Sequence, residues 1–155
     1  MKSRREAREI ALQCLYQCDT LEDWSDQSIE LFMTSFLDLD SGDLSSNQEF
    51  FKSLVIGIRD NLDVIDHQIS LASERWSISR MTRVDRNIIR ISCYEIGFLN
   101  KIPTNVSINE AIEISKNYSA EDSPMFINGV LDNLAQSIAT NGLSLVAQNN
   151  IKTVA

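Results

Sequence analysis

Three arginines and a tyrosine near the start of the chain carry side chains suited to binding a nucleic acid. Residues 4–18 have the apolar repeat of an amphipathic helix, and positions about 100° apart gather Arg4, Arg5, Arg8 and Tyr16 along one flank. A guanidinium can contact a phosphate bidentately or stack on an unpaired base, and a tyrosine ring can support a base by stacking. A solvated charged flank with a half-buried tyrosine is the alternative, and spacing alone favours it.

The charge of the chain is unevenly distributed, which limits what that flank can do alone. The formal net charge is −8, yet residues 1–18 carry four basic and two acidic side chains. Residues 19–50 carry nine acidic side chains and no lysine or arginine. So modest a basic patch is insufficient for nonspecific RNA binding, and the acidic segment could serve a basic partner.

A second group of arginines has helical spacing in the middle of the chain. It consists of Arg80, Arg83, Arg86 and Arg90, of which the last three project along one side of a helix. These side chains could extend a phosphate-binding path, or they could pair with the acidic residues of 19–50. The sequence leaves both interpretations open.

The elements that would position these residues are helices throughout. With only five glycines and two prolines, few positions break a helix, and we predict an all-α fold of about seven helices. Capping patterns indicate several helix starts: Ser3 with Glu6, Thr82 with Asp85, Ser107 with Glu110, and Ser123 before Pro124. The expected helices cover residues 4–18, 26–38, 48–60, 61–74, 83–98, 108–117 and 124–139, with a loop near 38–48.

The chain length fits one domain. We expect a single domain over residues 1–140, built of two packed helical halves at about 1–75 and 78–140, and a loosely ordered tail at 141–155. We find no signal peptide and no apolar run long enough to span a membrane. We therefore expect a cytoplasmic protein.

The cysteines do not form a metal-binding pattern. Cys14, Cys18 and Cys93 include no C-x-x-C pair, and His67 is the only histidine. A tetrahedral zinc site needs four such ligands, so we expect no metal, and we interpret the three cysteines as small buried hydrophobic residues in a reducing compartment.

Three stretches of the sequence resemble the NusB family in residue order and spacing. They are "SRREAREIALQCLYQ" at the start, "VDRNIIRISCYEI" in the middle and "IPTNVSINEAIEISKNYSAEDSPMFINGVLD" near the end. The last stretch combines I-P, INEAIE, AEDS and F-I-NGVLD in the family's order. The resemblance covers about residues 3–135.

This resemblance implies a NusB-like fold of two small helical bundles and a role in transcription antitermination. It implies binding to boxA, a short linear RNA signal, together with the ribosomal small-subunit protein that acts as NusE. It further implies that the complex joins RNA polymerase and other Nus factors and suppresses termination on ribosomal RNA operons. No catalysis and no cofactor are implied.

The resemblance also assigns roles to particular residues. By itself Asp122 is a favourable charge at a helix N-terminus and Phe126 is an aromatic residue at the core edge, but the matching family positions lie by the RNA. For the flank of the first helix, spacing alone favours a solvated charged surface, whereas the resemblance favours RNA binding. The RNA-binding residues it implies are Arg4, Arg5, Arg8, Tyr16, Arg86, Asp122 and Phe126, and the residues for a protein partner are Asp85, Glu110 and Glu113.

Two alternatives belong to other functional classes. We find no Gly-rich phosphate loop, nucleophile motif or ligand cluster, and although NusB-like domains occur fused to RNA cytosine methyltransferases, 155 residues leave no room for such a domain. We therefore expect no enzyme. The other alternative is a protein-interaction module that binds a basic ribosomal protein with little RNA contact of its own.

Overall fold

The computed structural model describes residues 1–37 and 44–141, and this part of the chain is all-helical. It contains seven α-helices and one short 3-10 helix, η1. Their bounds are α1 Arg4–Leu21, α2 Asp26–Leu37, α3 Ser46–Asp60, α4 Leu62–Ala72, η1 Ile78–Arg80, α5 Arg83–Phe98, α6 Thr104–Tyr118 and α7 Ser123–Asn141. The predicted fold class is confirmed. The predicted loop is only partly described, and the tail after residue 141 lies outside the described residues.

Most of the predicted helix starts are correct, and their caps explain them. Ser3 Oγ accepts a hydrogen bond from the Glu6 N–H at 3.1 Å, and Thr82 Oγ1 accepts one from the Asp85 N–H at 3.1 Å. A capping box that we did not predict, between Ser45 and Gln48, starts α3 at Ser46. Each cap satisfies backbone donors that have no partner within the helix.

The predicted start of α6 is wrong. The helix begins at Thr104, directly after Pro103, because the fixed φ of proline suits the residues that lead into a helix and its missing N–H costs nothing there. Ser107, which we expected to cap the helix, lies inside it, is buried, and donates its hydroxyl to Glu95 Oε1 at 2.9 Å. A Ser-x-x-Glu pattern that resembles a helix cap can therefore also lie inside a helix, with its serine in a buried polar contact.

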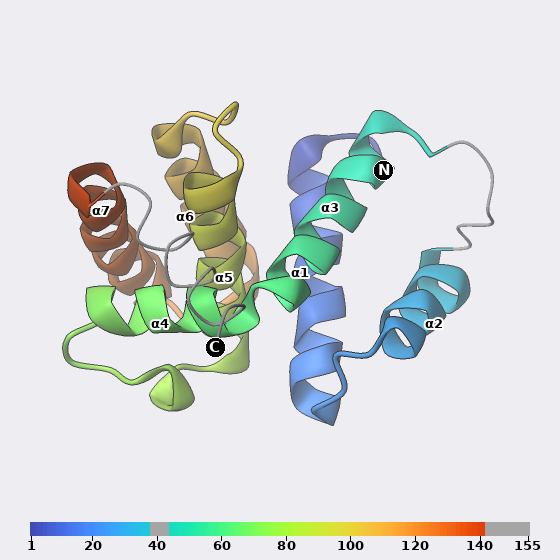
Figure 1. Ribbon diagram of the computed structural model, residues 1–155, viewed down its shortest axis with the longest axis horizontal. Helices are drawn as coiled ribbons and strands as arrows, with labels where there is room; N and C mark the ends of the chain where they lie inside the picture. Colours follow the sequence, from blue (N-terminus) through green and yellow to red (C-terminus); the bar gives the residue numbers. More distant parts are fainter. Residues whose placement is uncertain (38–43, 142–155) are drawn as a thin grey trace, which may run out of the picture.

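The central helix is α5, which contacts α1, α3, α4, α6 and α7. Figure 1 shows α1, α2 and α3 on one side of the molecule and α4 to α7 on the other. Although we expected α4 in the first half of the chain, it packs mainly against α7 and α5. The expected domain limits stay a prediction.

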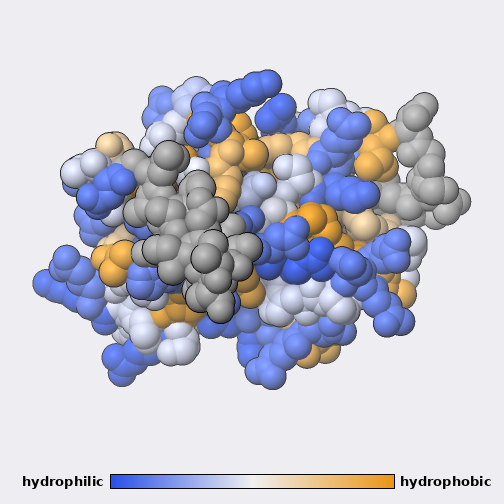
Figure 2. Space-filling view, in the orientation of Figure 1, coloured by the Kyte–Doolittle hydropathy of each residue, from blue (hydrophilic) through white to orange (hydrophobic). Residues whose placement is uncertain are grey.

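The core is continuous across both groups of helices. Its largest fully buried side chains include Leu15, Phe51, Ile65, Ile89 and Leu131. All three cysteines are buried and unpaired, as their interpretation as hydrophobic residues predicts. On the face in Figure 2, hydrophobic side chains appear as separate patches among hydrophilic ones. No helix in the described residues is both long and apolar enough to cross a membrane.

Candidate nucleic-acid interface

The first turn of α1 carries two exposed arginines with different partners. The Arg4 guanidinium lies over the Phe50 ring, 4.6 Å from its centroid. Arg5 forms a bidentate pair with Glu110, with its Nε and Nη2 donating to the two carboxylate oxygens at 2.7 and 3.2 Å. The Glu110 carboxylate raises the pKa of Arg5 by this hydrogen bond. Two residues predicted for different ligands, RNA and a protein, therefore bind each other.

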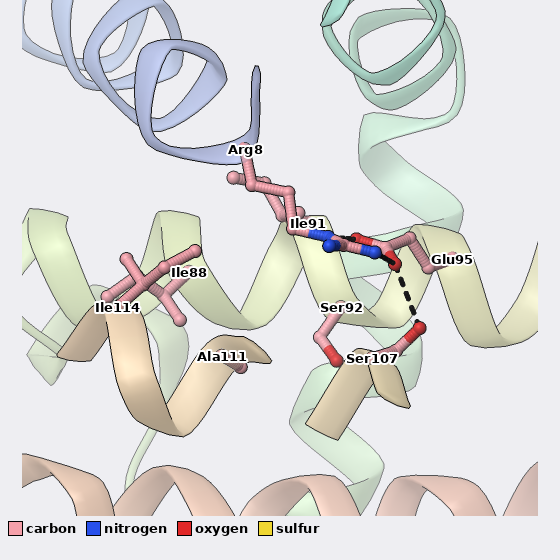
Figure 3. Close-up of a pocket in the computed structure, with 8 residues that line it drawn as sticks. All are labelled: Arg8, Ile88, Ile91, Ser92, Glu95, Ser107, Ala111 and Ile114. Carbon is pink, nitrogen blue, oxygen red and sulfur yellow. Dashed lines mark hydrogen bonds and ion pairs between the residues drawn. The ribbon is translucent and has the colours of Figure 1, made fainter. Parts of the chain in front are cut away.

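Arg8 does not lie on the exposed flank where the sequence placed it. The residue is 3% exposed, and its Nε and Nη2 donate to the two carboxylate oxygens of Glu95 at 2.8 and 2.7 Å. Figure 3 shows this pair between α1 and α5, with Ser107 hydrogen-bonded to the same carboxylate. Arg8 is a buried structural cation here and is not available at the surface.

The reason for this error is that α5 covers the flank of α1 that we expected to be free. Leu12, one turn after Arg8 on that flank, is also buried. A signal was present in the sequence, because Glu95 shares a helical face with the core residues Ile88 and Ile91. A carboxylate on a core face requires a buried partner, and Arg8 supplies it.

Tyr16 remains on the surface, with 43% of the residue exposed. It lies eleven positions after Arg5 on α1, which at the helical rise is about 16 Å along the axis. Eleven residues are close to three full turns, so the two side chains leave the helix in similar directions. The exposed part of the predicted flank therefore consists of Arg4, Arg5 and Tyr16.

The middle arginines divide between the two interpretations left open by the sequence. Arg86 Nε donates to Asp19 Oδ2 at 2.8 Å, and Arg90 contacts the same oxygen at 3.1 Å. Arg90 also forms a bidentate pair with Asp66, both distances being 2.8 Å. Arg86 and Arg90 therefore pair with acidic residues of the protein itself, and one of these acidic residues, Asp19, belongs to segment 19–50. Arg86 does not lie on a phosphate-binding path as predicted, because its guanidinium group binds Asp19.

The remaining two arginines of that group are exposed. Arg80 lies over the Trp76 ring, with its guanidinium carbon 5.7 Å from the ring centroid. Arg83, in the first turn of α5, is also exposed. Trp76, which is not among the predicted site residues, is 48% exposed. A large aromatic residue flanked by Arg75 and Arg80 was the available signal.

Asp85, Asp122 and Phe126 are brought together at one cleft. The cleft, of about 330 Å³, lies between the connection before α5 and the start of α7. Asp122 is exposed and Phe126 half-buried, whereas Asp85 is buried and accepts the Ser123 hydroxyl on Oδ2 at 2.9 Å. Asp85 was predicted to meet a protein partner, but its carboxylate instead holds the start of α7 against α5.

α6 extends from the contact with Arg5 on α1 toward this cleft. Arg5 contacts Glu110, and four residues later on α1 Glu9 accepts the Tyr118 hydroxyl at 2.7 Å, so α1 and α6 run in the same direction. α6 then ends at Tyr118, shortly before Asp122. The predicted partner residue Glu113 lies on α6 and pairs with Lys116 at 3.0 Å, and this hydrogen bond lowers the pKa of Glu113.

The packed α-helices and this surface of arginine, aromatic and acidic side chains define an all-α binding protein. A model of the NusB family matches residues 5–136. The chain belongs to the NusB family, as its sequence motifs predicted. This family comprises non-enzymatic factors that bind RNA and protein partners in transcription antitermination.

Comparison with individual proteins gives the same result. The chain is 43% identical over 141 residues to the transcription antitermination protein NusB of Geotalea daltonii, covering 89% of this chain and 97% of that protein. The structure of T. maritima NusB is similar with a TM-score of 0.74 and 38% identity, covering 88% of this chain and 93% of that one.

A more distant structure has the same fold. It is the crystal structure of antitermination factors NusB and NusE in complex with dsRNA, which matches with a TM-score of 0.75 and 24% identity, covering 88% of this chain and 98% of that one. At this identity the likeness concerns the fold alone.

Proposed function

We propose that this antitermination factor binds boxA RNA together with the ribosomal protein NusE, and that the complex joins RNA polymerase and other Nus factors on ribosomal RNA operons. In this proposal it acts in the cytoplasm, where transcription takes place. Membership of the NusB family supports the role, and the observation that carries it is the surface running from Arg5 to the Asp122–Phe126 cleft.

The RNA contacts in this proposal are the exposed members of the predicted set. Arg4 and Arg5 contact phosphates, Tyr16 and Phe126 stack on bases, and Asp122 accepts hydrogen bonds from base edges. Guanidinium groups suit phosphates, and aromatic faces accept any base. Arg8 and Arg86 have no direct part, because their guanidinium groups are committed to Glu95 and Asp19.

The protein partner in this proposal meets the acidic side of the same surface. Glu110 and Glu113 lie on α6 beside Arg5, and a basic ribosomal protein would pair with them. Binding of that protein to Glu110 would release Arg5 for a phosphate. The two ligands would then strengthen each other's binding, because each removes a competing contact.

A second candidate, an interaction module with little RNA contact, has one observation in its favour. Arg8, Arg86 and Arg90 are engaged in ion pairs within the protein, which removes three arginines from the candidate RNA contacts of a chain of net charge −8. This candidate requires binding to NusE but little dependence of RNA affinity on Arg5.

The test is binding of labelled boxA RNA to the protein with NusE, compared with scrambled RNA of the same composition. Preferential binding of boxA supports the proposal, and equal binding contradicts it. The matched substitutions are Arg5→Ala and Lys52→Ala, the second being an exposed cation on α3. The proposal expects only Arg5→Ala to weaken RNA binding; unchanged affinity in both favours the interaction module.

A further inference from the structure

The exposed tryptophan of the cleft has a chemistry of its own. Trp76 lies in the connection between α4 and η1, where the Ser73 hydroxyl donates to the Trp76 carbonyl oxygen at 2.8 Å and fixes the turn. Its ring is half exposed and carries the Arg80 guanidinium on one side. The exposed part of this large aromatic ring is available for stacking with a ligand.

The space beside Trp76 suits a small planar group. The residues that line the cleft of about 330 Å³ include Trp76, Arg80, Asp122 and Phe126. This volume is at the lower end of the roughly 300–1,000 Å³ typical of ligand pockets. Trp76 and Phe126 also line an adjoining hollow of about 520 Å³. Their side chains therefore form a ridge that is open on two sides.

The polar groups around the ridge define which planar group fits. The carboxylate of Asp122 is exposed at the cleft and can accept hydrogen bonds from ring or amino N–H groups. In the buried carboxylate of Asp85, Oδ1 has no hydrogen-bond partner among the described residues, and a buried acceptor without a donor is costly. Arg80, at the same cleft, supplies a positive charge for an anion.

We propose that Trp76 and Arg80 form a nucleobase-binding platform, in which an unpaired RNA base stacks on the Trp76 ring with its N–H groups toward Asp122, while Arg80 contacts the adjacent phosphate. This inference rests on the proposed function and extends it to two residues outside the predicted RNA-binding set. An aromatic face, a cation and a carboxylate acceptor at one cleft match the three parts of a nucleotide.

The test uses tryptophan fluorescence. The chain has two tryptophans, Trp24 and Trp76, so Trp24→Phe leaves Trp76 as its single tryptophan. Titration of this variant and NusE with boxA RNA should quench the emission, because a stacked base quenches an indole. The Trp24→Phe/Trp76→Phe double variant, titrated in parallel, corrects for any signal from NusE.

Affinity measurements complete the test. Trp76→Ala should weaken boxA binding about 5- to 150-fold, the range for loss of one base–aromatic stack, whereas Trp76→Phe should retain most of the affinity. Arg80→Ala should lower the slope of log affinity against log salt by about 0.7, the contribution of one phosphate contact on a single strand. Leu31→Ala, an exposed apolar position on α2, is the matched control and should have no effect.

The results distinguish this inference from the function on which it rests. If wild-type protein binds boxA RNA but the Trp76 emission and the affinity of Trp76→Ala are unchanged, the platform is refuted and the function stands. If Trp76→Ala loses NusE binding in the absence of RNA, Trp76 belongs to a protein interface and the platform is again refuted. If the wild-type protein does not bind RNA, both proposals fail.

Discussion

Arg8 of α1 and Glu95 of α5 form a bidentate ion pair in the interior, with both side chains at most 4% exposed. The pair joins the two helices on which most of the other helices pack. Removal of one partner from a buried pair leaves an uncompensated charge, which typically costs about 3–5 kcal/mol. The pair therefore fixes the position of α1, and with it the exposed Arg4 and Arg5.

Substitution of Arg8 should accordingly affect stability far more than substitution of Arg5. We expect Arg8→Ala to lower the free energy of unfolding in urea by about 3–5 kcal/mol. Arg5→Ala, which removes a half-exposed pair, should cost less than about 1 kcal/mol. Arg8→Met/Glu95→Gln should recover much of the loss, since Gln still accepts from Ser107. Equal losses in the two single variants would show that the buried pair has no special role.

Two helical glycines, Gly57 on α3 and Gly129 on α7, should respond oppositely to alanine. A Cβ at Gly57 would overlap the Tyr94 hydroxyl, and Tyr94 is held by stacking on Phe98 at 5.1 Å. Nothing lies within 4 Å of a Cβ at Gly129 on α7. Thermal or urea unfolding should show a loss of about 1–3 kcal/mol for Gly57→Ala and a gain of about 0.5–1 kcal/mol for Gly129→Ala. A stable Gly57→Ala protein would mean that Tyr94 moves freely.

Stability should fall at alkaline pH because of Cys93. Burial raises the pKa of the Cys93 thiol from its ordinary value near 9.0, so above about pH 9 the unfolded chain loses a proton that the folded chain keeps. Stability is then complete below about pH 9 and falls as the pH rises, by up to about 1.4 kcal/mol per pH unit for this group. Urea unfolding of Cys93→Ala between about pH 8 and 10 should show a shallower decline than wild type. Parallel declines would contradict the assignment.

RNA affinity should depend on salt, and the dependence should identify the phosphate contacts. Each lysine or arginine that neutralises a phosphate contributes about 0.7 to the slope of log affinity against log salt for a single strand. Arg4→Ala and Arg5→Ala should each lower that slope by about this amount in the mixture with NusE. Arg83→Ala serves as the comparison outside the proposed surface. A slope unchanged in both variants would exclude phosphate contacts at the start of α1.

The sequence was sufficient to predict most of the helices, because hydrophobic periodicity and caps such as Thr82 act locally. The errors concern side chains whose environment is set by a distant helix. Arg8 and Arg86 were assigned to the surface because periodicity does not reveal which flank another helix covers. Their partners, Glu95 and Asp19, are 87 and 67 residues away in the sequence. Asp122 and Phe126, in contrast, were selected from the family motifs without any information on packing, and the structure places both residues at one cleft.

Because the sequence does not show how distant helices pack, the candidate site differs from the predicted set of residues. It lacks Arg8 and Arg86, and it includes Trp76 and Arg80, which are outside that set. Arginines with helical spacing are equally suited to pair with an acidic residue inside the protein or with a phosphate. Only the packing of the helices shows that Arg90 is buried and paired internally, whereas Arg80 is exposed. The neighbouring Arg75 and Arg80 were a signal for Trp76 in the sequence, but Trp76 follows no periodic pattern, so its exposure could not be deduced from that signal. It became a candidate only when the structure placed it beside Phe126.

The most direct test is the affinity of boxA RNA for the protein with NusE, measured with wild type and with Arg5→Ala at one salt concentration and against scrambled RNA. We predict that wild type binds boxA more tightly than scrambled RNA, and that Arg5→Ala loses affinity for boxA while its unfolding free energy changes by less than about 1 kcal/mol. Equal binding of boxA and scrambled RNA by the wild-type protein would contradict the account.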